Sequence, residues 1–188
     1  MTETANLNDD AANGALDRAI DTLLALAGER PWREISLRLI AETADVPLTE
    51  LYPMAKSKGA LLAHLSARLD EGALATAATA SDDPHDRLFD AVMARIEAME
   101  PHRAALTAIA RDAGPVALIP HFPPTARAIL EAAGVEATPP RLAAMTALWA
   151  RTAQVWRDDE GALNRTMAEI DKRLKQMRGQ LRRIGAGF

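Results

Sequence analysis

The chain has 188 residues, 22 basic and 26 acidic side chains, and a formal net charge of −4. It contains no cysteine, which excludes disulfides and thiolate metal sites, and its length suits one or two small cores, not a large multidomain enzyme. Alanine and leucine dominate over the β-branched residues, which favours helices. We therefore predict an all-α fold.

The N-terminal stretch MTETANLNDD is polar and acidic, the opposite of a secretory signal. We predict a disordered tail over residues 1–10. No apolar run in the sequence reaches membrane-spanning length, so we expect a cytoplasmic protein without a membrane span. The first helix should then run from about Ala11 to Gly28, with a buried stripe that includes Leu16, Ile20 and Leu23.

Two short helices with a tight break between them are predicted next. Ser36 is a candidate N-cap, and the residues after it repeat at helical spacing up to Ala44. Asp45 and Val46 interrupt that helix, and Pro47 suits the first turn of a second helix that reaches about Tyr52. This pattern is typical of a helix-turn-helix over residues 11–57. Trp32, in the connection before it, should pack against the first helix.

The residues of this stretch resemble the DNA-binding signature of the TetR family of bacterial transcriptional regulators. The matching positions are Ser36, Arg38, Ile40, Ala41, Val46, Leu51, Tyr52, Lys58, Leu61 and Leu62. The resemblance covers residues 15–70, and it implies a TetR-like fold with an N-terminal helix-turn-helix head and a helical ligand-binding and dimerisation body over residues 58–188. Glu50, Pro53, Met54 and Ala55 depart from the family pattern, which leaves fewer base-reading side chains.

The resemblance implies a set of residues that contact double-stranded operator DNA. Thr49 and Tyr52 are the candidates for base edges, and the basic side chains are candidates chiefly for phosphate, a contact that positions a protein without reading sequence. The predicted DNA-binding residues are Ser36, Arg38, Thr49, Tyr52, Lys56 and Lys58.

The body should consist of successive helices separated by proline and glycine breaks. A long helix begins after the N-cap candidate Ser57 and extends to about Ala80, and Pro84 opens the next. Further helices are expected over residues 102–113 and 125–133, with a short apolar element at 116–119 between them. Thr138-Pro139-Pro140 opens the penultimate helix, and the last helix carries apolar residues from Leu163 to Ile184. A turn at Asp158-Asp159-Glu160-Gly161 separates the two helices.

The last two helices carry apolar seams with spacings of three and four, so they should form a helical hairpin. TetR-like proteins dimerise through this pair, and we expect a homodimer through residues 140–184. The alternative is a monomer in which the seam faces its own body. The basic run between Lys172 and Arg183 is either a solvated helix face or an amphipathic surface for anionic lipid.

No nucleotide loop, metalloprotease motif or nucleophile elbow occurs, and the four histidines lack metal-ligand spacing. We therefore expect a protein that is not an enzyme and uses no cofactor or metal. An apolar pocket for a small apolar or amphipathic ligand is plausible in the body, although each lining residue could instead fill a core. The candidates are Met93, Ile96, Met99, Leu106, Phe122, Trp149 and Trp156; the two tryptophans could also anchor an interface.

A second resemblance concerns residues 147–177. The tryptophan helix, the W-x-D-D run that starts at Trp156, and the following Thr166 are similar to part of a TetR-fold lipid-binding family that assists ubiquinone biosynthesis. Members of that family have lost DNA binding. Two functions are thus predicted: a ligand-responsive, DNA-binding transcriptional regulator, most often a repressor, or, as the alternative, a lipid- or isoprenoid-binding accessory protein.

Overall fold

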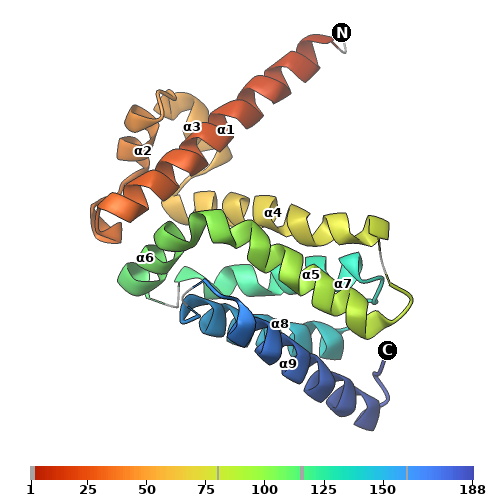
Figure 1. Ribbon diagram of the computed structural model, residues 1–188. Helices are drawn as coiled ribbons and strands as arrows, with labels where there is room; N and C mark the ends of the chain where they lie inside the picture. The colour runs from red at the N-terminus through yellow and green to blue at the C-terminus, as the bar shows by residue number, and fades with distance from the viewer. Residues whose placement is uncertain (1–2, 80, 115–116, 160) are drawn as a thin grey trace. The chain divides into compact units, whose positions relative to one another are not determined.

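The computed structural model describes residues 3–79, 81–114, 117–159 and 161–188. Within these residues the chain is helical and contains no strand, as the composition predicts (Figure 1). It divides into two compact units: the described residues up to Leu65 with those of Ala104–Ala117, and the described residues of Ser66–Arg103 and Leu118–Phe188. The first unit is therefore discontinuous in sequence. Its limits differ from the predicted boundary after residue 57.

The first unit begins with α1 (Glu3–Glu29) and the single turn η1 (Trp32–Glu34), followed by α2 (Leu37–Thr43) and α3 (Leu48–Met54). It also contains the first part of α4 (Lys58–Ala75) and α6 (Arg103–Ala113) from Ala104 onward. The predicted stripe of α1 is buried at Ile20 and Leu23, whereas Leu16 is only partly buried. Leu51 of α3 and Leu61 of α4 are fully enclosed as well.

Helix α1 starts at Glu3, eight residues before the predicted Ala11. The disorder predicted for residues 1–10 stays a prediction. Residues 3–12 contain neither proline nor glycine. Nothing in their backbone chemistry stops a helix once its nucleus has formed in the apolar stripe downstream. Polarity alone was therefore a poor guide to where this helix begins.

The break between α2 and α3 lies where the sequence predicts it. The Ser36 hydroxyl accepts a hydrogen bond from the backbone N–H of Leu39 (3.1 Å), which confirms the predicted N-cap. Asp45 adopts a left-handed backbone conformation (φ 50°), which aspartate tolerates better than most residues. Val46 is buried behind the turn, and Pro47 occupies the N-cap position of α3.

Helix α4 starts as predicted, with the Ser57 hydroxyl accepting from the N–H of Ala60 (3.1 Å). It ends at Ala75, five residues before the predicted Ala80, and passes into the turn η2 (Thr76–Thr79). The Thr76 hydroxyl donates to the carbonyl of Ala73 (2.7 Å). Such local side-chain bonds compete with the backbone ladder, which explains the early end.

The second unit packs α5 (Pro84–Met99) against α7 (Phe122–Ala132), α8 (Pro139–Arg157) and α9 (Asn164–Arg183). Helix α7 begins three residues before the predicted Thr125 because Pro123 and Pro124 fit its first turn. The turns η3 (Glu100–His102) and η5 (Ile119–His121) precede α6 and α7. Val116, in the predicted apolar element, lies outside the described residues.

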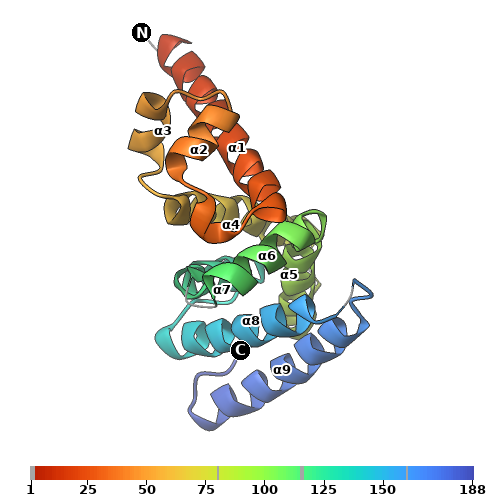
Figure 2. The same ribbon diagram turned by 90° about the vertical axis from the view of Figure 1, so that its left-hand side faces the viewer.

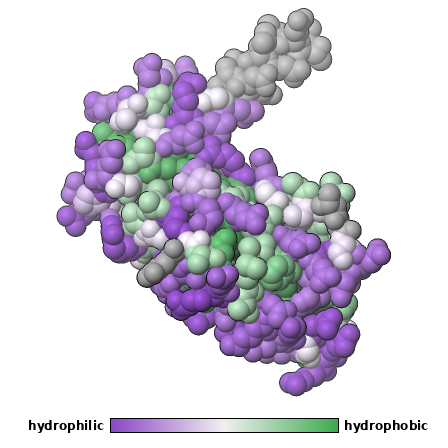
Figure 3. Space-filling model, viewed as in Figure 1, coloured by the Kyte–Doolittle hydropathy of each residue, from purple (hydrophilic) through white to green (hydrophobic). Residues whose placement is uncertain are grey.

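Helices α8 and α9 lie side by side as a hairpin (Figure 2). The seam of this hairpin faces its own chain, because Met145, Trp149, Trp156, Ile170 and Leu174 are buried. The outer surface over α9 is mainly hydrophilic (Figure 3). Its exposed side chains include Lys172, Lys175, Gln176, Gln180, Arg182 and Arg183. The predicted homodimer stays a prediction. An interface on the outer surface of α9 would be more polar than the apolar seam predicts.

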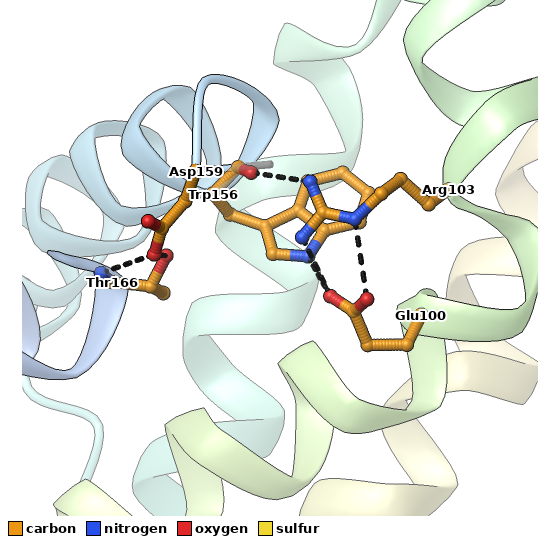
Figure 4. A network of polar contacts seen from close by, with 5 residues as sticks. All are labelled: Glu100, Arg103, Trp156, Asp159 and Thr166. Atoms are coloured by element: carbon orange, nitrogen blue, oxygen red, sulfur yellow. Dashed lines mark hydrogen bonds and ion pairs between the residues drawn. The ribbon is translucent and has the colours of Figure 1, made fainter. Parts of the chain in front are cut away.

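Helix α9 lacks a capping residue at its own N-cap position. Leu163 stands there with a left-handed backbone (φ 57°) and no side-chain acceptor. Asp159, in the turn before it, takes over: its carboxylate accepts from the Thr166 backbone N–H (2.8 Å) and hydroxyl (2.7 Å) (Figure 4). Burial acts against the charged form of Asp159, but these hydrogen bonds and nearby arginines outweigh it and lower the pKa of the carboxyl.

We expect Asp159→Ala to lower the free energy of unfolding by about 1–2 kcal/mol at pH 7, the usual effect of losing a cap. Urea unfolding followed by circular dichroism would measure it. Because the folded pKa of Asp159 is lowered, the contribution is complete above the unfolded pKa and is lost as the pH falls through the folded pKa. The matched variant Asp158→Ala, at an exposed neighbour, should change stability by less than about 0.5 kcal/mol. If the two variants lowered stability equally, Asp159 would not act as the cap of α9.

Candidate nucleic-acid interface and buried polar cluster

The candidate interface is the outward face of the α2–α3 pair. Helix α3 has only seven residues, and it is anchored through Leu51, which is fully buried. Around that anchor, Thr49 and Tyr52 turn outward, and the Tyr52 side chain is 53% exposed. The two predicted base-reading residues therefore lie on the exposed side of the second helix. Glu50 shares this exposure and places a carboxylate between them in sequence.

Arg38 and Lys56 are exposed, as a phosphate contact requires. Arg38, however, is already engaged within α2: its Nε donates to Glu42 Oε1 at 2.7 Å. This hydrogen bond and the charge of Glu42 raise the pKa of Arg38. A phosphate would have to compete with Glu42 for the same guanidinium, in contact with solvent where such pairs are weak.

The structure places Lys58 in another role than the predicted phosphate contact. Its Nζ donates to the carbonyl of Trp32 and to that of Ile35 (2.8 Å), and it lies 4.3 Å from the centroid of the Trp32 ring. Burial lowers the pKa of Lys58. Lys58 thus ties the start of α4 to the chain leading into α2. Ser36 is likewise engaged, as the cap of α2.

A second hydrogen bond connects the turn η1 to α6. The Trp32 backbone N–H donates to Asp112 Oδ2 (3.3 Å), across 80 residues of sequence. The hydrogen bond from Arg111 and that from Trp32 lower the pKa of Asp112. Sequence reasoning missed this contact, and no spacing rule could have found it. The predicted packing of Trp32 on α1 stays a prediction.

The predicted pocket residues divide between the two units, and the pocket itself stays a prediction. Ile96, Met99, Trp149 and Trp156 are buried in the second unit, where Met93 and Phe122 are partly exposed. Leu106 belongs to α6, which groups with the first unit. Helix α5 ends at Met99, and the chain groups with the first unit from Ala104 onward.

A buried polar cluster, which the sequence analysis did not foresee, lies inside the second unit. Arg95 of α5 is 4% exposed and Asp70 of α4 is 6% exposed, and Arg95 Nε donates to Asp70 Oδ1 at 2.6 Å. Thr125 of α7, fully buried, donates to the same carboxylate (2.9 Å). Ser66 Oγ lies near both Thr125 Oγ1 (3.3 Å) and Arg95 Nη2 (3.4 Å).

The Trp149 ring lies beside this cluster, and His121 interacts electrostatically with its Asp70. The Arg95 guanidinium lies 5.3 Å from the centroid of the Trp149 ring. Burial lowers the pKa of His121, while the charge of Asp70 opposes that shift. A signal for the cluster was present in the sequence. Arg95 falls on the stripe of α5 that also carries Leu88, Val92 and Met99, with spacings of four, three and four.

The W-x-D-D run forms a network that holds the hairpin to the end of α5 (Figure 4). Trp156 Nε1 donates to Glu100, and Arg103 donates to Glu100 Oε1 (2.7 Å) and to the Trp156 carbonyl (2.7 Å). The Arg103 guanidinium also lies 4.3 Å from the centroid of the Trp156 ring. Together with the Asp159 cap, these contacts give the motif a structural role.

Neither the family models nor the curated proteins compared with this chain match it. Among the described residues, no group of three or more His, Asp or Glu side chains is arranged to hold a metal ion. In that same part of the chain, no helix is both long and apolar enough to span a membrane. Function has to be inferred from the two sites above.

We expect Lys58→Met to lower the free energy of unfolding by about 1–3 kcal/mol, because it keeps the apolar stem and removes the two hydrogen bonds from Nζ to backbone carbonyls. The Trp32 carbonyl still accepts from the Ile35 N–H. Chemical denaturation would measure the loss. Lys56→Met makes the same chemical change at an exposed position two residues away, and it should cost less than about 0.5 kcal/mol. A Lys58→Met protein as stable as Lys56→Met would show that the two carbonyl bonds contribute nothing.

We expect Asp70→Asn to destabilise the protein by about 3 kcal/mol or more, because it leaves the buried Arg95 without its counter-charge. Thermal and urea unfolding would measure the change. The control is Asp90→Asn, which makes the same substitution at an exposed position of α5. Replacing both charges, with Asp70→Leu and Arg95→Met together, should cost less than Asp70→Asn alone. If the double variant were the least stable, the ion pair itself would be a net source of stability.

Proposed function

We propose that the protein is a ligand-responsive transcriptional regulator of the TetR type, which binds double-stranded operator DNA as a homodimer in the cytoplasm. The observation that supports this most is the α2–α3 pair: a capped first helix, a tight turn, and a second helix anchored by Leu51 with Thr49 and Tyr52 directed outward. A short exposed helix of this kind is the element that helix-turn-helix proteins place in the major groove.

The hydrogen bonds of Lys58 and Ser36 favour different roles within the predicted contact set. Thr49 and Tyr52 remain the candidates for base edges, and Lys56 and Arg38 remain those for phosphate. Lys58 and Ser36 act by holding the pair in place, since their polar atoms bond to the backbone. The number of direct phosphate contacts is then small, and the salt dependence of binding should be modest.

The test is a fluorescence-anisotropy titration of the full-length protein against DNA from its own upstream region, at low and at physiological salt. A sequence-specific regulator binds this DNA at physiological salt and prefers it to random duplex of equal length. Binding no tighter than to random duplex would contradict the proposal, provided that mass spectrometry finds no small molecule already bound to the protein.

A second function is favoured by the acidic side chains on the same face. Glu42, Asp45 and Glu50 are all exposed on the pair or its turn, and carboxylates repel phosphate. Together with the C-terminal resemblance, they fit a lipid- or isoprenoid-binding accessory protein that does not bind DNA. Co-purified lipid, and flotation with anionic liposomes but not with neutral ones, would support this function in a protein that fails the DNA titration.

We expect Glu42→Gln to tighten DNA binding several-fold, because it removes a repulsive charge and weakens the 2.7 Å hydrogen bond that engages Arg38, which then lacks an ionised acceptor. The slope of log affinity against log salt should steepen as Arg38 takes up a phosphate contact. Glu131→Gln, an exposed glutamate of α7, makes the same change in net charge and serves as the control. If both substitutions had equal effects, the change in net charge would explain them, and Arg38 would not be a DNA contact.

A further inference from the structure

The buried guanidinium of Arg95 has hydrogen-bonding capacity that the described part of the chain does not use. Its Nε donates to Asp70, and its Nη2 reaches Ser66 at 3.4 Å. Its Nη1 is shut off from solvent and has no hydrogen-bond partner among the described residues. An unmet buried donor of this kind costs free energy unless an acceptor is supplied from elsewhere.

The surroundings of the Arg95 guanidinium determine which acceptors would suit Nη1. Helices α4, α5 and α7 contribute Asp70, Arg95 and Thr125, and the Trp149 ring of α8 lies against the guanidinium. Val92, Ile96 and Met145 of the same unit are apolar and fully buried. The interior of this unit is thus mainly apolar with a few polar groups, of which Arg95 Nη1 and the hydroxyls of Thr138 and Thr152 have no partner among the described residues. Such a composition is usual for a small-molecule site.

The charge of the cluster selects among acceptors. Asp70 already balances Arg95, so a second carboxylate at Nη1 would enter the interior without a positive partner of its own, which is costly. A neutral carbonyl oxygen accepts the same hydrogen bond without adding charge. Its cost of desolvation is also far smaller than that of an ion.

We propose that the second unit binds a neutral, mainly apolar carbonyl compound, whose oxygen accepts a hydrogen bond from Arg95 Nη1. This inference rests on the proposed function in one respect, since it names the class of ligand to which the regulator responds. Because Nη1 is closed off from solvent, the bound compound is enclosed. It enters and leaves only when the surrounding helices move.

The test is isothermal titration calorimetry of the full-length protein with 1-tetralone, with its hydrocarbon counterpart tetralin, and with the anion 1-naphthoate. The flexible ketone 2-octanone is added so that the result does not depend on one shape. We expect the ketones to saturate a single site and tetralone to bind about tenfold or more tighter than tetralin, the effect of one hydrogen bond to a charged donor. Naphthoate should bind more weakly than tetralone.

Arg95→Lys keeps a positive charge beside Asp70 and removes Nη1, so it should abolish the preference for tetralone over tetralin. Arg87→Lys is the matched control: it lies on the same helix and bonds to the backbone carbonyls of Ala133, Ser81 and Asp82. It should leave the preference unchanged. If Arg95→Lys fails to fold, the infrared carbonyl stretch of tetralone bound to the unaltered protein provides a second measurement, and a shift to lower frequency is expected.

Three outcomes would overturn the inference. If neither ketone binds, an ordered water serves as the acceptor of Nη1. If naphthoate binds more tightly than tetralone, the ligand class is wrong, and if Arg95→Lys retains the preference, the site is elsewhere. None of these measurements involves DNA, so a failure of the ligand inference and a failure of the DNA titration are distinguishable.

Discussion

The candidate interface depends on how a single lysine holds the chain that leads into it. Lys58 donates to the carbonyls of Trp32, the first residue of η1, and of Ile35, which follows η1, and it lies over the Trp32 ring. The N-cap of α2 follows directly at Ser36. The position of the α2–α3 pair therefore depends on how η1 is held. An ammonium with several donors and a long apolar stem suits the task, because it satisfies separate acceptors while its stem stays buried.

Local chemistry accounts for what the sequence predicted well. The caps at Ser36 and Ser57, the break at Asp45–Pro47 and the buried stripe of α1 depend on residues within a few positions of one another. Their outcome is fixed by short-range hydrogen bonding and by helical periodicity. The start of α1 was mispredicted, because polarity reports on burial and not on helicity.

The site residues were harder to predict, because their roles depend on distant partners. Lys58 was expected to face a phosphate and instead faces backbone carbonyls, and nothing near Lys58 in sequence marks Trp32 as its partner. Asp70 and Arg95 are 25 residues apart on two helices. Only the place of Arg95 within an apolar stripe hinted that it is buried. A charged residue within an apolar stripe should therefore be predicted as buried and paired.

The hydrogen bond between Trp32 and Asp112 bears on the order in which the chain can fold as it is synthesised. The first unit is completed by the described residues of Ala104–Ala117, so it cannot close when its N-terminal helices leave the ribosome. The intervening segment, most of α4 and all of α5, must be made first, and loop closure over such a distance slows folding. A fragment cut after the α2–α3 pair would lack both Lys58 and Asp112. Work on the isolated head would therefore need α6 supplied as a separate peptide or joined by a linker.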